Sequence, residues 1–371
     1  LITNLSFLEK NKPDQLIKFL KMKNNRLGII GGGQLGMFTC IAAKKKKIKS
    51  VVLSETNEFS AKKFCDKFLI SDFKNLNNID KFIDSADYFT IETENIPISI
   101  IRYIEKKKKV FPCSKVIEIS QNRLKEKKFL NSITGVRTTE YHEIESFEDF
   151  KYASKNFSYK CILKSKELGY DGKGQYKINK NNLDIFKEFN FKNFILEKFV
   201  DFKKEISVVV VKSKESAINY PTVENIHKKS ILRESFYPAK ISKEIESEAI
   251  IKSFEIANQI SLNGVLAIEM FILKNNQILI NELAPRPHNS GHWSMDACNE
   301  SQYDNLINSI FFNELKPPKV IGKCRMINLI GNDYKKIDFL KKKYRCYDYF
   351  KKEIRDSRKM GHYIILDQLN S

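Results

Sequence analysis

The sequence predicts an α/β fold in the first third of the chain and an α+β fold in the rest of its 371 residues. Up to about residue 120, short apolar runs alternate with helical stretches, a pattern typical of a parallel sheet with helices between its strands. From residue 161 on, strand-like runs are joined by glycine-rich or asparagine-rich turns. A chain of this length holds two or three domains with substantial cores.

Composition excludes several classes of protein. Hydrophobic residues make up 42% of the chain, as in a globular protein, and no apolar run approaches the roughly 18 residues that a membrane span needs. The net charge of +20 comes from lysines spread along the sequence, such as Lys44 to Lys47 and Lys106 to Lys109. Without an arginine cluster, this pattern favours solvated helix faces over a nucleic-acid interface. We therefore expect neither a nucleic-acid nor a membrane partner.

The seven cysteines are scattered and never spaced as Cys-x-x-Cys. This spacing indicates neither a disulfide framework nor a zinc site, and it favours a reducing cytoplasm. Residues 1–25 are polar and lysine-rich, and we expect them to form an extension outside the fold.

Regular structure is predicted to begin with a strand–turn–helix unit. Leu27 to Ile30 is strand-like, Gly31 to Gly36 matches G-x-G-x-x-G, and Met37 to Lys46 is helical. A second strand, Val51 to Leu53, precedes Glu55, which lies where a ribose-binding acid of a dinucleotide site belongs. A nicotinamide oxidoreductase is thus one hypothesis. The motif is weak alone, because a glycine turn at a helix N-terminus binds any phosphate or serves close packing.

Further strands are predicted at 68–71, 88–92 and 110–111, which completes a parallel sheet of Rossmann type. Ligands of such sheets bind at the carboxyl ends of the strands. Glu92 and Glu94 lie at one such end, and their acidic side chains suit the hydroxyl or amine groups of a ligand better than its phosphate. An ordinary strand-end loop is the alternative.

A glycine-rich loop, Gly169 to Gln175, follows the predicted strand Cys161 to Lys164. Free backbone N–H groups together with Lys164 and Lys173 suit a triphosphate. The loop is not a P-loop, since no G-x-x-x-x-G-K-[ST] occurs. Further on, the strand-like Phe194 to Val200 offers a backbone edge to adenine, and Glu205 offers an acid to ribose hydroxyls.

A hairpin is predicted from Leu266 to Ile280, with Asn275 and Asn276 as a two-residue turn. Lys274 then pairs with Gln277, and Glu269 lies opposite Glu282. Opposed carboxylates are destabilising unless neutralised, and Mg²⁺ shared with nucleotide phosphates is the expected remedy. Two solvated glutamates on an ordinary hairpin are the alternative. The segment that follows, up to Trp293, adds arginine and two histidines, so it suits a cation and an anion together.

Five segments in this order resemble the N5-carboxyaminoimidazole ribonucleotide synthetase family of ATP-grasp enzymes over about residues 26 to 365: Gly31 to Gly36, Gln121 to Arg123, Gly169 to Gln175, Glu224 to His227 and Asn281 to Trp293. The resemblance implies a Rossmann-like preATP-grasp domain at 26–120, an ATP-grasp domain at 121–317 and a small C-terminal domain at 318–371.

The implied reaction is a ligation in de novo purine biosynthesis. MgATP phosphorylates bicarbonate to carboxyphosphate, which then carboxylates the amine of 5-aminoimidazole ribonucleotide. The resemblance also implies a homodimer. Other ATP-grasp ligases remain alternatives, such as a formate-dependent glycinamide ribonucleotide transformylase or a biotin carboxylase.

The resemblance also implies the site residues. Those implied for ATP are Arg123, Lys164, Gly169, Tyr170, Asp171, Gly172, Lys173, Gly174, Gln175, Glu197, Lys198, Phe199, Val200, Glu205, His227, Asn281 and Glu282. Glu269 and Glu282 are implied to hold magnesium, and Asp171, Lys173, Arg286 and His288 to act in catalysis. Those implied for the ribonucleotide are Gly33, Gln34, Leu35, Glu92, Glu94, His288, Asn289, Lys352, Arg355, Arg358 and Lys359.

The chain departs from the family pattern at two places. Met37 follows the glycine turn where arginine is usual, and Asp356-Ser357 stand between Arg355 and Arg358 where proline is common. A surface basic run is the alternative for Lys352 to His362. Trp293 suits packing against the site wall, and His142 lies outside every motif.

Overall fold

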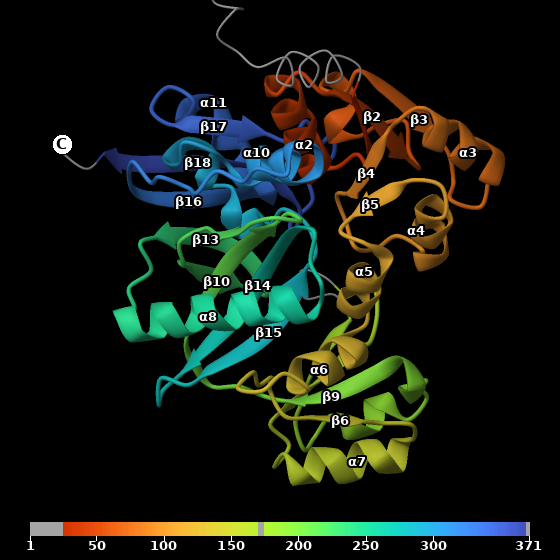
Figure 1. The fold of residues 1–371 in the computed structure, drawn as a ribbon. Coiled ribbons are helices and arrows are strands. Elements are labelled where there is room, and N and C mark those ends of the chain that lie inside the picture. Colours follow the sequence, from red (N-terminus) through yellow and green to blue (C-terminus); the bar gives the residue numbers. More distant parts are fainter. Residues whose placement is uncertain (1–24, 170–173, 369–371) are drawn as a thin grey trace, which may run out of the picture.

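The computed structural model describes residues 25–169 and 174–368, and three β-sheets organise this part of the chain (Figure 1). No helix in the described residues is long and apolar enough to cross a membrane.

The first sheet is parallel, with the strand order β3-β2-β1-β4-β5. Both faces of this sheet are buried. Leu27 and Ile29 belong to the core on one face, and Phe89 belongs to the core on the other. The predicted Rossmann-like sheet is confirmed. The elements are β1 (Arg26–Ile30), α2 (Gln34–Lys45), β2 (Lys49–Ser54), η1 (Ser60–Lys63), β3 (Lys67–Ile70), α3 (Leu76–Asp84), β4 (Tyr88–Ile91), α4 (Ile98–Glu105), β5 (Lys109–Phe111) and α5 (Ser114–Gln121).

A second, antiparallel sheet has the order β6-β9-β7-β8 and lies at the far end of the molecule from the first sheet (Figure 1). Its core is rich in phenylalanine, with Phe150 and Phe191 stacked at 5.2 Å between ring centroids. The elements are α6 (Arg123–Asn131), β6 (Tyr141–Glu143), α7 (Phe147–Asn156), β7 (Cys161–Ser165), β8 (Gln175–Ile178), η2 (Leu183–Phe186), η3 (Phe191–Asn193) and β9 (Phe194–Lys198).

The third sheet has nine strands and is buried on both faces. Along β10, Val208 and Val210 pack with Ala257 of helix α8, whereas Val209 and Val211 join the core on the opposite face, as the two-residue period of a strand requires. Its elements up to the hairpin are β10 (Phe202–Lys212), β11 (Ala217–Asn219), β12 (Val223–Lys228), β13 (Ile231–Tyr237), α8 (Lys243–Gln259), β14 (Gly264–Leu273) and β15 (Ile278–Ala284).

The C-terminal segment continues this third sheet, because β16 pairs with β13. The C-terminal strands therefore lie beside the site-bearing strands of the central region. The remaining elements are η4 (Asn289–Gly291), α9 (Ser294–Ala297), α10 (Gln302–Ile307), η5 (Asn308–Phe312), β16 (Gly322–Ile330), η6 (Gly331–Lys336), α11 (Ile337–Leu340), β17 (Arg345–Asp348) and β18 (Lys359–Gln368).

The β14–β15 hairpin confirms the predicted pairing of Glu269 with Glu282. The predicted turn is wrong, because Leu273 donates its N–H to the carbonyl of Gln277 and the loop has one residue more. Asn276 ends this loop at φ 65°, a left-handed conformation that asparagine tolerates. A β-bulge between Glu269 and Met270 shifts the register back by one residue. The two irregularities compensate, so the two carboxylates still face each other.

Candidate active site

The opposed carboxylates of β14 and β15 lie at the centre of a cluster of charged side chains. His288 Nε2 is 3.3 Å from Glu269 Oε1, and Arg123 Nη1 is 3.3 Å from Glu282 Oε2. Asn281 donates from Nδ2 to Glu269 Oε2 at 3.5 Å. Burial and the negative charge of Glu282 raise the pKa of Glu269 to about 7. Within the part of the chain that the structure describes, Glu269 is therefore not fully compensated by positive charge.

The donor set fits a magnesium ion that is shared with a ligand. In the described residues, no group of three or more His, Cys, Asp or Glu side chains is arranged to hold a metal by itself. Mg²⁺ is commonly bound by one or two carboxylates, with phosphate oxygens and waters completing the octahedron. Glu269 and Glu282 supply those two carboxylates.

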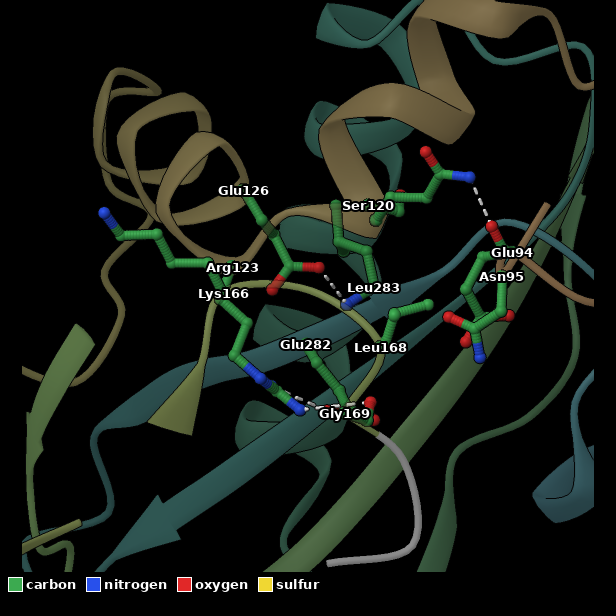
Figure 2. Close-up of a pocket in the computed structure, with 11 residues that line it drawn as sticks. Glu94, Asn95, Ser120, Arg123, Glu126, Lys166, Leu168, Gly169, Glu282 and Leu283 are labelled. Atoms are coloured by element: carbon green, nitrogen blue, oxygen red, sulfur yellow. Dashed lines mark hydrogen bonds and ion pairs between the residues drawn. The ribbon is translucent and has the colours of Figure 1, made fainter. Parts of the chain in front are cut away.

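Helix α6 supplies Arg123 and also brings the carboxyl group of Glu126 to this cluster. Arg123 also donates from Nη2 to the carbonyl of Gly169 at 3.4 Å, and Glu126 accepts the N–H of Leu283 at 2.9 Å (Figure 2). Burial and the charge of Glu282 raise the pKa of Glu126 to about 8. A pocket that is partly open to solvent lies at this end of α6. Its lining includes Glu94, Gln121, Arg123, Glu126, Lys166, Gly169 and Glu282.

The sequence interpretation missed Glu126 and Lys127. A signal for them was available, because residues three and four positions after Arg123 share its face of a helix. Lys127 is buried, and its Nζ lies 3.4 Å from Glu197 Oε1.

Glu197 is the centre of a buried charge cluster. Lys164 donates from Nζ to Glu197 Oε2 at 2.8 Å, on the side opposite Lys127. Burial alone would raise the pKa of Glu197, but the charges of Lys164, Lys127 and Arg123 lower it to about 2. The carboxylate is therefore ionised, and it holds Lys164 beside the expected phosphate loop.

Four predicted members of that loop, Tyr170, Asp171, Gly172 and Lys173, lie outside the described residues. Its two ends are described. Gly174 has φ 67°, and a Cβ there would lie 2.4 Å from Ser165 Oγ, so this position requires glycine. Gln175 pairs with Lys164 across β7 and β8.

The segment predicted to meet adenine leads out of β9. Lys198 forms an ion pair with Glu140 at 2.5 Å, and Phe199 is 45% exposed with Val200 beside it. The N–H of Phe199 already donates to the carbonyl of Lys160 at 2.8 Å.

The acid predicted for ribose hydroxyls, Glu205, is hydrogen-bonded to Nδ1 of His227. Burial opposes protonation of this histidine, but the bond to Glu205 and the charge of Glu269 raise its pKa. These two predicted residues therefore lie together, next to the carboxylate pair.

The glycine turn of the first domain encloses a carboxylate of the chain itself. Glu92 Oε2 accepts the N–H of Gly36 at 3.1 Å, and a Cβ on Gly33 would lie 2.7 Å from both carboxylate oxygens. Gln34 and the buried Leu35 form the first turn of α2 behind it. Because Glu92 takes the position that a pyrophosphate would need, the geometry is contrary to the nicotinamide oxidoreductase hypothesis.

The segment after β15 is buried and connected to the first domain. Arg286 forms a two-pronged ion pair with Glu94, with Nη2 donating to Oε1 at 2.9 Å. His288 and Asn289 are buried beside it. Trp293 stacks on Tyr237 at 5.0 Å between ring centroids, so its role is packing. His142, which no motif contained, lies away on β6 against Phe157.

The predicted basic segment of the C-terminal region divides in two. Lys352 pairs with Glu58, and Arg355 and Arg358 both bond to Glu353, by its carboxylate and its carbonyl. Lys359 is buried instead, and its charge acts on Glu269, His227 and His288. The structure thus brings Lys359 into the charged cluster and leaves the other three at the surface.

Comparison with known families agrees with this arrangement. Residues 22–121 match the ribonucleotide synthetase preATP-grasp domain, residues 129–303 the ATP-grasp domain, and residues 324–370 the phosphoribosylaminoimidazole carboxylase C-terminal domain. All three are found in the order that the sequence motifs implied.

Individual proteins are similar over nearly the whole chain. The N5-carboxyaminoimidazole ribonucleotide synthase of Bacillus subtilis is 34% identical, with 91% of its length and 92% of this chain covered. The bifunctional purine synthesis protein purC/E of Dictyostelium discoideum is also 34% identical over 91% of this chain, which spans 36% of that longer protein.

Two solved structures are similar in fold. An ADP complex of N5-carboxyaminoimidazole ribonucleotide synthetase has a TM-score of 0.88 and 34% identity, with 93% of both chains covered. The enzyme of Aspergillus clavatus, in complex with ADP and 5-aminoimidazole ribonucleotide, has a TM-score of 0.85 and 25% identity, with 94% of this chain and 95% of that chain covered. The chain therefore belongs to the N5-carboxyaminoimidazole ribonucleotide synthase family of ATP-grasp enzymes.

Proposed function

We propose that the protein is an ATP-grasp ligase that carboxylates the amine of 5-aminoimidazole ribonucleotide with bicarbonate, at the expense of ATP, in purine biosynthesis. The relatives named as N5-carboxyaminoimidazole ribonucleotide synthases support the reaction, and the relative that holds ADP and 5-aminoimidazole ribonucleotide supports the substrates. The same comparisons do not favour formate or biotin as the acceptor.

The observation that carries this proposal is the continuity of β15. One strand presents Glu282 opposite Glu269 and leads within a few residues to Arg286 and His288, which face acids of both the central and the first domain. A cation site for phosphates and a site for the acceptor are thus adjacent. Phosphoryl transfer needs such positioning and charge neutralisation rather than a protein nucleophile.

In the first step, an oxygen of bicarbonate attacks the γ-phosphorus of ATP, the bond to ADP breaks, and carboxyphosphate forms. Lys164, held by Glu197, and Arg123, which reaches Glu282 and Gly169, would bind the phosphates. Glu269 and Glu282 would hold Mg²⁺, which neutralises phosphate charge when bound. We assign the loop from Gly169 to Gln175, including Asp171 and Lys173, to closure over the phosphates.

In the second step, the amine attacks the carboxyl carbon and the bond between carbon and the phosphate oxygen breaks. Inorganic phosphate leaves with the bonding electrons and takes up the proton that the amine loses. Arg286 and His288 would stabilise the developing anion. Glu92, Glu94, Asn289 and Lys359 are proposed to bind the ribonucleotide. Exclusion of water by the closed site would protect carboxyphosphate from hydrolysis.

We further propose a cytoplasmic location and a homodimer. All seven cysteines are free thiols in the structure, which suits a reducing compartment. The homodimer is carried over from the family resemblance, and sedimentation of the purified protein tests it.

A coupled assay of ADP and phosphate release tests the proposed reaction, with bicarbonate and 5-aminoimidazole ribonucleotide omitted in turn. We expect full turnover only when MgATP and both acceptors are present. ATP turnover that is indifferent to both acceptors would overturn the proposal.

A further inference from the structure

We infer that His288 is held as the neutral tautomer that carries its proton on Nε2, and that it acts as a fixed hydrogen-bond donor rather than as a general base. The residues that hold it are Ser235, Asn225, Ser207 and Ser290, called here the serine–asparagine chain. The role of His288 as a donor in turnover rests on the proposed function. Its tautomer does not, because it is a property of the protein without ligands.

The serine–asparagine chain crosses three neighbouring strands in the interior. Ser235 Oγ donates to Asn225 Oδ1 at 2.7 Å, Asn225 Nδ2 donates to Ser207 Oγ at 2.9 Å, and Ser207 Oγ donates to Ser290 Oγ at 2.8 Å. All four side chains are at most 5% exposed. Because each hydroxyl has one proton, a donated proton fixes the direction of the next bond.

The end of this chain lies at the imidazole. Ser290 Oγ is 2.8 Å from His288 Nδ1. Ser207 already supplies the proton for its own bond to Ser290, so the Ser290 proton is available for Nδ1. The serine–asparagine chain therefore places a hydrogen-bond donor, the Ser290 hydroxyl, at this ring nitrogen.

A second donor points at the same nitrogen and independently shows that Nδ1 is an acceptor. The backbone N–H of Ser290 donates to His288 Nδ1 at 3.3 Å, so that His288 caps the short η4 turn. A peptide N–H can only donate. If Nδ1 carried a proton, two protons would face each other in a buried site, so Nδ1 must be the lone-pair nitrogen.

Since a neutral imidazole carries one proton, that proton is on Nε2. Nε2 lies 3.3 Å from Glu269 Oε1, so this proton faces the carboxyl group of Glu269. A general base would need a lone pair at Nε2, where the inferred tautomer carries its proton, so His288 would instead donate a hydrogen bond to an anionic oxygen of the bound reactants. Ser290 and Ser207 are positioning residues that act through it.

Nuclear magnetic resonance of the ¹⁵N-histidine-labelled protein tests the tautomer directly. The chain has five histidines, so loss of a signal in His288→Gln assigns its resonances. We expect a pyridine-type shift at Nδ1 and a pyrrole-type shift at Nε2. The opposite pair of shifts would overturn the inference. The measurement needs no substrate, so it stands even if the proposed carboxylation fails in the assay above.

A matched pair of variants tests the donor role in turnover. Glutamine at position 288 places an amide N–H near the Nε2 position but has no base, whereas asparagine keeps the cap near Nδ1 and loses the distal donor. Removal of a stabilising donor costs about 100-fold or more in kcat. We expect that loss for His288→Asn and a loss within about 10-fold for His288→Gln, with the KM for MgATP unchanged in both. Equal losses would contradict the donor role.

Ser290→Ala tests the positioning role. Only the backbone donor remains in this variant, so we expect the pyridine-type signal of Nδ1 to move and kcat to fall about 10-fold, as for other residues that orient an active group through a hydrogen bond. Ser253→Ala is the control, since Ser253 is equally buried and bonds within α8 to Ala249. An unchanged Nδ1 signal in Ser290→Ala would show that Ser290 does not donate to His288 and is not part of the serine–asparagine chain.

Discussion

At the scale of single residues, the site contains buried charges that depend on neighbouring charges of opposite sign. Glu197 is 3% exposed and is held between Lys164 and Lys127. Glu269 and Glu282, in contrast, repel each other, and this repulsion adds to burial in raising the pKa of Glu269. The lysines compensate the charge of Glu197 within the protein. The repulsion between Glu269 and Glu282 would be reduced by a bound cation.

Glu282→Gln is expected to abolish metal-dependent turnover and to leave the fold intact. The substitution removes a proposed Mg²⁺ ligand, for which we expect a loss of about 100-fold or more in kcat. It also removes the repulsion that raises the pKa of Glu269, so the midpoint of thermal unfolding should not fall. Magnesium titrations of turnover and thermal melts measure the two effects.

Glu248→Gln is the matched control for this prediction, because the Glu248 side chain is 47% exposed and forms an ion pair with Lys252 on α8. Near-normal, magnesium-dependent turnover in Glu282→Gln would count against the metal assignment.

Glu197→Gln is expected to destabilise the protein, by roughly 3 to 5 kcal/mol, because it leaves two buried lysines with an uncompensated charge. The effect depends on pH. The pKa of Glu197 falls from 4.5 to about 2 on folding, so its contribution is fully present above pH 4.5 and is lost as the pH falls towards 2. Urea unfolding of the wild type and the variant should therefore differ most near pH 7 and least in acid. A difference that is constant with pH would refute this account.

At the scale of elements, the sequence predicted pairings better than turns. The alternation of apolar residues fixed which strands form and which side chains share a face, so Glu269 was placed opposite Glu282 correctly. The three-residue loop and the bulge were not predictable, because nothing in Lys274 to Gln277 distinguishes a turn of two residues from one of three. The error in the turn was cancelled by the bulge.

The contacts that the sequence did not reveal join elements far apart in the chain. Glu92 lies 56 residues from Gly36, to which it is bonded, and Glu126 lies 157 residues from Leu283. No local period connects such partners, so only the folded chain identifies them. From the sequence, the glycine turn fits a phosphate-binding motif. Only the folded structure shows that Glu92 occupies it.

Gly33→Ala is expected to displace Glu92 and to weaken binding of the ribonucleotide. Gly33 has φ −71°, which alanine adopts without strain, so the only penalty is the contact of its Cβ with both carboxylate oxygens at 2.7 Å. Such overpacking costs about 1 to 3 kcal/mol. Steady-state kinetics should show a higher KM for 5-aminoimidazole ribonucleotide and an unchanged KM for MgATP.

Gly135→Ala controls for loss of stability, because Gly135 has φ 79° and no atom within 4 Å of an added Cβ. A Gly33→Ala protein with both KM values unchanged would show that Glu92 takes no part in binding the ribonucleotide.

At the scale of the whole molecule, three parts of the chain converge on one cluster of rings. Phe38 of α2 contacts His292, Tyr303, Tyr347, Tyr349 and His362 at 5.2 to 6.0 Å between centroids. His292 and His362 stack at 4.8 Å. The cluster joins the first domain to the segment that carries His288 and to the strand that carries Lys359, and the ion pair of Lys46 with Glu300 at 2.7 Å reinforces this junction.

This ring cluster is expected to make stability depend on pH. Burial lowers the pKa of His362 to about 3 and places the pKa of His292 well below its usual range. Both rings are therefore neutral in the folded protein, whereas the unfolded chain protonates them near pH 6.5. Stability is complete above pH 6.5 and falls as the pH drops below it, by up to about 1.4 kcal/mol per histidine and pH unit.

His362→Phe should reduce that slope, since phenylalanine keeps a ring in the stack and takes up no proton when the chain unfolds. The absolute stability of the variant also changes through the lost bond between Tyr349 and His362 Nδ1 at 2.8 Å, so the slope between pH 6.5 and 5 is the quantity to compare. Urea unfolding of the wild type, His362→Phe and His142→Phe measures it, with His142 as the control because it lies on β6 in another sheet. Equal slopes of unfolding free energy against pH in the wild type and His362→Phe would show that other groups cause the acid sensitivity. The ring cluster would then contribute packing but no dependence on pH.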